Sequence, residues 1–121
     1  MIDLPPVDPK RFAVEWAADQ DVLERLAADG DNSAIARPVD VSFRGPLEAL
    51  HALEMAAEEL GFSVLEEEQS GDGDRWLFLE RVQTTDAPSI QELTETCLRI
   101  EAYFGLEYDG WGCLAENGSS H

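Results

Sequence analysis

The sequence predicts a single α+β domain built from four strands, two long helices and one short helix. Three observations lead to this fold class. Strand-like runs alternate apolar and polar residues, helix-like runs place apolar residues three and four positions apart, and glycine follows each helical run. The chain has 121 residues, 44% of them hydrophobic, so we expect one hydrophobic core and one domain.

Residues 1–20 are predicted to form an N-terminal arm. Prolines at three of the first nine positions favour an extended backbone over a helix. The arm also carries Phe12, Val14 and Trp16, and these side chains are too apolar for a free linker. We therefore expect the arm to pack on the domain. A short helix follows at about residues 21–29, and a glycine ends it.

The main domain is predicted to span residues 21–116. After the short helix, its elements follow the order β-α-β-β-α-β. The strands are expected at residues 38–43, 62–66, 75–82 and 106–114, and the helices at residues 46–60 and 88–104. Ser89 and Glu92 predict a capping box at the start of the second long helix. Because both long helices are apolar on one side only, they should cover one face of a four-stranded antiparallel sheet, which is the ferredoxin-like arrangement. Residues 117–121 are expected to be frayed.

The last predicted strand contains two glycines, Gly110 and Gly112, which weaken a strand unless something approaches it closely. Regular alternation along this strand places Tyr108 and both glycines on one face and Trp111 on the other. A helix could then lie close to the sheet over the glycines. We therefore expect Trp111 to point away from the two long helices.

The chain carries 26 acidic and 8 basic residues, which give a net charge of −18. This charge argues against binding to nucleic acid, whose phosphates are bound by Lys and Arg, and against anionic membrane surfaces. It favours a protein partner with a basic surface, because opposite potentials steer encounter. Solubility alone is the other explanation, and composition does not separate the two.

The sequence contains no apolar run of the length found in a signal peptide or a membrane span. Its two cysteines, Cys97 and Cys113, do not form the framework of a disulfide-rich domain. We therefore expect a cytoplasmic protein with reduced thiols. The spacing leaves open whether the two cysteines pair with each other.

No motif in the sequence predicts catalysis, a cofactor or a metal. Histidine occurs only as His51 and His121, and no nucleophile has a base partner of the kind that covalent catalysis requires. No phosphate loop or dinucleotide fingerprint is present. The acidic turns at residues 29–32 and 70–74 lack the spacing of a calcium loop. We expect no catalytic, cofactor-binding or metal-binding residues.

Acidic and aromatic side chains near the predicted sheet are the candidates for partner binding. The acids could form a surface that meets Arg- and Lys-rich segments, and the aromatic side chains could act as binding hot spots. The candidates are Glu66, Glu67, Glu68, Asp72, Asp74, Trp76, Tyr108, Asp109 and Trp111. The alternative for the acids is a solvated strand end, and the alternative for the aromatic residues is the core or a place beneath the N-terminal arm.

The run Glu107–Gly112, with the letters EYDGWG, follows a predicted helix that ends in Phe104. At this run the sequence resembles the bacterial RraB family, which consists of protein regulators of ribonuclease E. Two weaker patterns agree, the L-x-x-x-G-D pattern of Leu26–Asp31 and the β-α-β opening of Val39–Val64. The resemblance covers about residues 19–114. The best-known members carry a long acidic C-terminal tail, which this sequence lacks.

The resemblance implies a ferredoxin-like fold and a non-enzymatic role, in which the protein binds the non-catalytic scaffold region of the ribonuclease and lowers its activity on RNA. Our first hypothesis is an acidic protein that docks on a basic partner, a ribonuclease of the E type, and inhibits or modulates it. The second is an inhibitor that mimics nucleic acid or neutralises a toxin. A third, a cryptic hydrolase, requires a cleft that contains carboxylates with perturbed pKa values.

Overall fold

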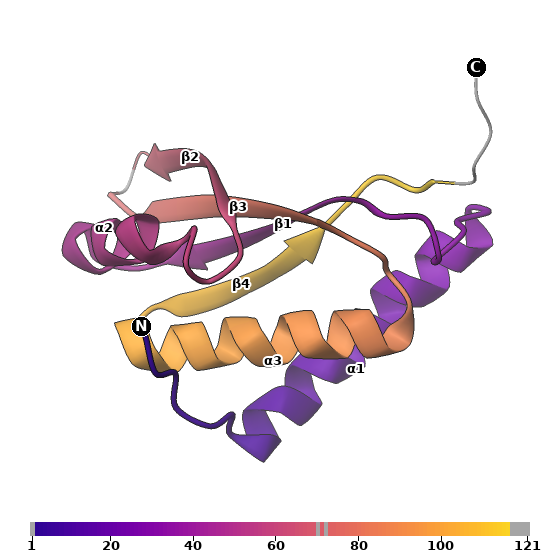
Figure 1. The fold of residues 1–121 in the computed structure, drawn as a ribbon, viewed down its shortest axis with the longest axis horizontal. Coiled ribbons are helices and arrows are strands. Elements are labelled where there is room, and N and C mark those ends of the chain that lie inside the picture. The colour runs from indigo at the N-terminus through magenta and orange to yellow at the C-terminus, as the bar shows by residue number, and fades with distance from the viewer. Residues whose placement is uncertain (1, 70, 72, 117–121) are drawn as a thin grey trace.

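The computed structural model describes residues 2–69, 71 and 73–116 of the chain. Three helices and four strands lie in these residues (Figure 1). In chain order they are α1 (Pro9–Ala28), β1 (Arg37–Arg44), α2 (Leu47–Ala56), β2 (Ser63–Gln69), β3 (Arg75–Gln83), α3 (Ala87–Phe104) and β4 (Glu107–Gly112). The α+β class predicted from the sequence is confirmed. The fraying predicted for residues 117–121 lies outside the described residues.

The four strands form one antiparallel sheet in the order β2-β3-β1-β4. The central strands β1 and β3 pair without interruption over the whole length of β1. Each outer pairing contains a bulge, because β2 has the extra residue Leu65 and β4 has one extra residue within Asp109–Gly110. The bulges decide which face of the sheet each outer-strand side chain occupies.

The hydrophobic core lies on one face of the sheet, between the strands and the helices α2 and α3. Alternate residues of β1 and β3 point into it, because successive side chains of a strand turn to opposite faces. Fully buried members are Val39, Val41 and Phe43 from β1, Leu77 and Leu79 from β3, Leu50 and Leu53 from α2, and Ile90, Leu93, Cys97 and Ile100 from α3. The intervening residues of β1 and β3, such as Ser42 and Phe78, face the other side of the sheet.

Helix α1 departs from the prediction of an extended arm over residues 1–20. The helix begins at Pro9. Proline is tolerated there because the backbone N–H groups of the first turn form no hydrogen bond within the helix. The Asp8 side chain accepts a hydrogen bond from the Lys10 backbone N–H in the first turn. Phe12 and Trp16 lie one turn apart and pack against the core. The expected arm and short helix are thus one helix, and the prediction of extended structure was wrong from Pro9 onward.

The N-terminal helix adds to the helical side of the domain. α1 packs against α3. In Figure 1, α3 and the first part of α1 lie below the strands, and α1 then rises on the right. The segment before α1 lies along α3 as well, because the Arg99 guanidinium donates hydrogen bonds to the backbone oxygens of Leu4 and Pro5 at 2.9 and 2.8 Å. The helices are therefore not the simple pair on one face that the sequence predicted.

The bulge in β4 reverses the face of Trp111. Tyr108 pairs with Phe43 and Trp111 pairs with Val41, so both aromatic side chains lie on the core side of the sheet. Gly110 accommodates the extra residue between them with a φ of 100°, a conformation that residues with a Cβ disfavour. The prediction that Trp111 points away from the helices was wrong, because regular alternation fails across a bulge.

Asp19 in α1 links three elements beside this bulge. It is 3% exposed, and its carboxylate accepts hydrogen bonds from the Trp111 indole N–H at 2.9 Å and from the Thr94 hydroxyl. Because Thr94 lies in α3 and Trp111 in β4, one carboxylate ties the N-terminal helix to α3 and to the sheet. Burial raises the pKa of Asp19, and the two hydrogen bonds oppose that shift.

Helix α3 begins one residue before its predicted start, and its cap differs from the prediction. The Asp86 carboxylate accepts hydrogen bonds from the Ser89 backbone N–H at 3.2 Å and from the Ser89 hydroxyl at 3.0 Å. An aspartate at the N-cap satisfies a backbone donor of the first turn in this way. The capping box predicted from Ser89 and Glu92 was therefore wrong.

The two cysteines are free thiols. Cys97 is fully buried in the core, and burial raises the pKa of its thiol, which keeps it neutral.

Within the described residues, none of the helices combines the length and the hydropathy that crossing a membrane requires.

Replacement of Gly110 by alanine should destabilise the fold through the backbone alone. A Cβ added there meets no other atom within 4 Å, but φ is 100°, and such strain costs about 1–3 kcal/mol. Gly112→Ala is the matched control in the same strand, because its Cβ meets the Asp40 carboxylate at 3.5 Å without a positive φ. Chemical denaturation should show a lower free energy of unfolding for Gly110→Ala only. Equal unfolding midpoints for both variants would contradict the bulge.

The raised pKa of Asp19 predicts a pH dependence of stability. The folded state binds the Asp19 proton more tightly than the unfolded chain does, so stability falls as pH rises through the window between the unfolded pKa and the higher folded pKa. Asp19→Asn removes the charge and keeps an oxygen that accepts from the Trp111 indole. This variant should lose that part of the pH dependence and be at least as stable as the wild type at neutral pH.

Asp19→Ala is the contrasting variant. It leaves the Trp111 indole N–H and the Thr94 hydroxyl without their partner, which should cost about 1–3 kcal/mol. Thermal unfolding across the acidic and neutral range measures both variants. A pH profile of Asp19→Asn that matches the wild type would show that Asp19 does not titrate in this window.

Candidate functional site

Among the described residues, no helix contributes to a core on the second face of the sheet. The residues on this face alternate with the core residues of each strand, and strand pairing arranges them in rows. The rows are Glu68, Trp76, Arg44 and Glu107; Glu66, Phe78 and Ser42; Ser63, Glu80, Asp40 and Gly112; and Val82 with Pro38. We call these residues, together with Asp109 in the bulge, the open face.

Two aromatic side chains form the centre of the open face. Trp76 and Phe78 lie two residues apart on β3, so both point to the same side. Each is only partly buried, and neither belongs to the hydrophobic cluster that the helices cover. Val82 continues the same line and is 67% exposed. Apolar surface of this kind, surrounded by polar residues, is typical of a binding site.

Acidic side chains flank this aromatic strip on its β2 side and follow it along β3. Glu66 pairs with Phe78 and Glu68 with Trp76, so two carboxylates flank the strip from β2. On the other central strand, Asp40 stands directly opposite Glu80. On the β1 side the strip meets Ser42 and Arg44. The surface is therefore apolar in its middle and negative along β2 and at the Asp40–Glu80 pair.

Arg44 is the basic residue of the open face, and acids already surround it. Its guanidinium donates hydrogen bonds to the Glu107 carboxylate and lies 3.7 Å from the Asp74 carboxylate. The hydrogen bond to Glu107 is the main reason that the pKa of Arg44 is raised, and the negative charges of Glu107, Asp74 and Asp109 add to it. Because its charge is compensated locally, Arg44 does not neutralise the remaining acids of the face.

The structure divides the candidates that the sequence suggested. Glu66, Glu68, Trp76 and Asp109 belong to the open face, and Asp74 lies just before β3, close to Arg44. Glu67, Tyr108 and Trp111 lie on the core side of the sheet. Asp72 falls outside the described residues.

Tyr108 and Trp111 are structural residues in this arrangement. Tyr108 is 3% exposed, and its ring lies 5.5 Å from that of Phe43, measured between ring centroids. The Trp111 indole donates its hydrogen bond to Asp19. Of the three aromatic candidates, only Trp76 lies on the open face. The open face therefore contains part of the predicted site and excludes two of its aromatic residues.

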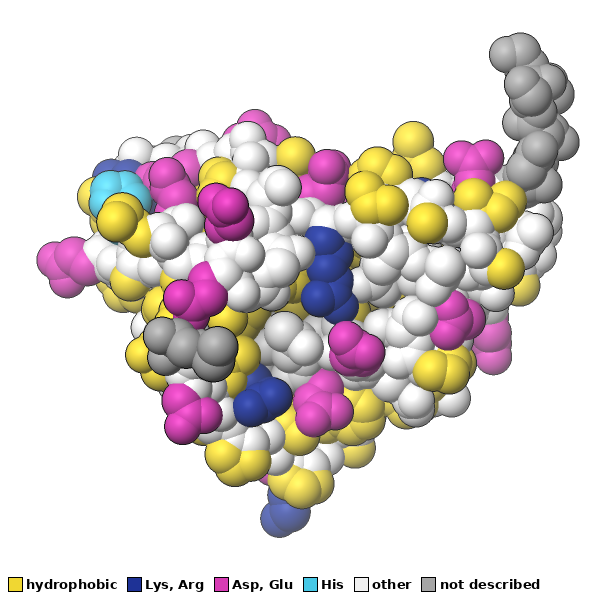
Figure 2. Space-filling view, in the orientation of Figure 1, with side chains coloured by type: hydrophobic (Ala, Val, Ile, Leu, Met, Phe, Trp, Pro, Cys, Tyr) yellow, Lys and Arg dark blue, Asp and Glu magenta, His cyan; other side chains and the backbone are white. Residues whose placement is uncertain are grey.

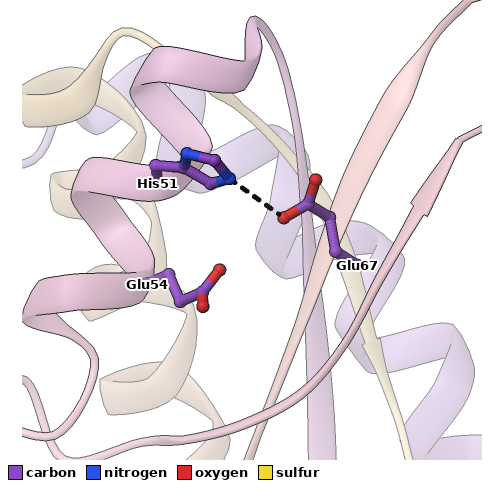
Figure 3. A group of neighbouring side chains, drawn as sticks. All are labelled: His51, Glu54 and Glu67. Atoms are coloured by element: carbon purple, nitrogen blue, oxygen red, sulfur yellow. Dashed lines mark ion pairs between the residues drawn. The ribbon is translucent and has the colours of Figure 1, made fainter.

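Glu67 meets two residues of α2 instead (Figure 3). The His51 Nε2 atom lies 3.5 Å from Glu67 Oε2, and Glu54 adds a third ligand-type atom, with all three atoms within 4.8 Å of one another. Sequence reasoning missed this group because it joins a helix to a distant strand. All three side chains are exposed, and Glu67 also lies 3.7 Å from the Arg75 guanidinium. A solvated cluster of polar and charged side chains accounts for the arrangement without a metal.

Negative charge is not confined to the open face. Figure 2 shows acidic side chains spread over the visible surface, with few Lys and Arg side chains between them. This distribution agrees with the net charge of −18. Exposed acids also occur on all three helices, for example Glu24, Glu54 and Glu92. The open face is therefore distinguished by the combination of acids with a partly buried aromatic strip.

Sequence reasoning missed most of the other residues of this face, among them Asp40, Phe78 and Glu80. Alternation within β3 was the available signal for Phe78, because it lies between the two buried leucines Leu77 and Leu79. The opposition of Asp40 and Glu80 depends on the register between two strands, which composition and spacing do not define.

Comparison with known proteins gives one result. The family described as RraB, regulator of ribonuclease activity B, matches residues 16–113. This range includes all four strands and most of α1. A comparison with curated proteins finds no match. The resemblance that began with the run Glu107–Gly112 is confirmed, and the chain belongs to the RraB family of regulators of ribonuclease activity.

Proposed function

We propose that this chain regulates a ribonuclease of the E type by docking on a basic region of that enzyme. The observation that carries the proposal is the family match over residues 16–113. The net charge of −18 supports a basic docking region, because a strongly negative surface accelerates encounter with a positive one. Regulation would follow from occlusion or remodelling of the ribonuclease, without chemistry of its own.

The fold is compatible with this role. The strand order β2-β3-β1-β4 supports the ferredoxin-like arrangement that the resemblance implied, to which α1 is an addition. Among the described residues the hydrophobic core lies on one side of the sheet, and this supports the other side as the surface that meets a second protein. The proposal also places the protein in the cytoplasm, where ribonucleases meet cellular RNA.

Addition of the purified chain to the full-length ribonuclease should lower its cleavage of a defined RNA. Binding of the two proteins, measured by calorimetry, should weaken by at least about tenfold between low and high salt. The reason is that dissolved salt screens the attraction between exposed charges, with a screening length of about 10 Å at 0.1 M salt that becomes shorter as salt is added. Affinity that does not depend on salt would contradict docking on a basic region. Unchanged RNA cleavage with the complex formed would contradict regulation.

The RNA-cleavage assay, repeated at several RNA concentrations, separates docking from mimicry of nucleic acid. A mimic occupies the RNA-binding site, so it raises the apparent KM for RNA and leaves kcat unchanged. A regulator that docks elsewhere lowers kcat. Inhibition that excess RNA fully reverses would favour the mimic over the function proposed here.

A further inference from the structure

Two like charges face each other across the open face, at Asp40 and Glu80. Asp40 and Glu80 stand directly opposite each other on adjacent strands, and like charges in that position destabilise a sheet. Both are partly buried. Among the described residues, neither side chain has a hydrogen bond or an ion pair with a basic group. A cation that approaches from outside would therefore relieve a repulsion that the folded chain retains.

The basic residue beside this pair, Arg37, already binds other groups of the chain. Arg37 lines the same groove as Asp40 and Glu80, but it is 4% exposed and forms an ion pair with Asp31. Its guanidinium also donates hydrogen bonds to the backbone oxygens of Asn32 and Ile35. Arg37 holds together the loop before β1 and is not free to turn toward the paired acids.

The residues that line this groove favour a side chain with an apolar stem and a cationic end. Pro38 and Leu114 line it together with the two carboxylates, and Leu114 is 85% exposed. Arginine fits this combination, because its methylene stem packs on apolar surface while its planar guanidinium donates to carboxylates in pairs. The compact lysine ammonium lacks the planar fork.

The aromatic strip favours the same kind of group at regular spacing. Trp76 and Phe78 present ring surface beside Glu68 and Glu66, and a guanidinium binds well between an aromatic face and a carboxylate. Side chains on one face of a strand repeat about every 6.6 Å, and alternate side chains of an extended peptide have the same repeat. An extended segment that runs along β3 can therefore place successive arginines at Trp76, Phe78 and Glu80.

From these observations we infer that the open face binds an extended, arginine-rich segment of the partner protein. One guanidinium lies between Asp40 and Glu80, and others lie over Trp76 and Phe78 beside Glu68 and Glu66. This inference rests on the proposed function, because the ribonuclease supplies the segment. It adds the face, the conformation of the bound segment and the preference for arginine.

Charge decides against the two other classes of occupant. A nucleic acid would bring phosphates to a face whose basic residue, Arg44, is already bound by acids. A second copy of the chain carries the same net charge of −18, so its acidic side chains would repel those of the first copy.

The double variant Asp40→Asn/Glu80→Gln tests the inference directly. It should bind the full-length ribonuclease at least about tenfold more weakly, since truncating one side of a close charge pair costs this much or more. Its own stability should equal or exceed that of the wild type, because a repulsion is removed. Weaker binding together with undiminished stability separates a lost contact from a lost fold.

Glu92→Gln/Glu95→Gln is the matched control. Both residues are exposed on α3, so this variant changes the net charge by the same amount on the helical side. Its affinity should stay within about twofold of the wild type. An equal loss of affinity in both double variants would show that overall charge, and no particular face, governs binding.

Two synthetic peptides test the preference for arginine. One has arginine at alternate positions, and the other has lysine at the same positions. In NMR titrations, the arginine peptide should shift the Trp76 indole N–H signal and bind more tightly than the lysine peptide. The Trp111 indole signal, held by Asp19, should not move. Equal affinity of the two peptides, or a shift of Trp111 instead of Trp76, would overturn the inference.

The outcomes separate the inference from the proposed function. If the wild type fails to bind the ribonuclease, the proposed function fails. If the wild type binds and Asp40→Asn/Glu80→Gln binds equally well, the function stands and the open face is not the docking surface. A Trp76 signal that shifts with the concentration of the chain alone would assign the face to a second copy and overturn the inference.

Discussion

The hydrogen bond between the Trp111 indole and the Asp19 carboxylate joins the helical side of this domain to its sheet. It exists because β4 contains one extra residue, which turns Trp111 to the same side as Tyr108. The Thr94 hydroxyl binds the same carboxylate and brings α3 into the junction. A buried carboxylate is costly unless its oxygens are hydrogen-bonded, so this position of α1 and the bulge depend on each other.

This junction also determines what the other side of the sheet can be. With Tyr108 and Trp111 both facing the helices, the second face retains acids, Arg44, small residues, Val82 and the two rings of Trp76 and Phe78. The N-terminal segment is held along α3 by Arg99 and so does not cover that face. Within the described residues, one side of the sheet therefore packs on the hydrophobic core, and the other side has no helix that packs a core against it.

Local patterns in the sequence predicted most of the elements. β1, β3 and α3 agree with the expected ranges to within a few residues, because alternation and helical spacing report burial directly. α1 was misread, because its proline lies at the one helical position that tolerates it and the Phe12–Trp16 spacing was overlooked.

The site was predictable only in part. Glu66, Glu68 and Trp76 were candidates from the sequence, and they meet on one face. The face of Trp111 required knowledge of the bulge, and the opposition of Asp40 and Glu80 required the register between β1 and β3. Both are properties of strand pairing, which involves residues far apart in the chain.

The run of three glutamates has a further consequence because of where β2 lies. β2 is the outermost strand beside β3, and all of its residues are exposed. An outermost strand presents unpaired backbone groups, which invite another chain to extend the sheet and aggregate. Glu66, Glu67 and Glu68 give this border three carboxylates, and the Leu65 bulge interrupts its regular shape. A second copy that approached this edge in register would bring the same three glutamates, so like charges oppose pairing of two copies through β2.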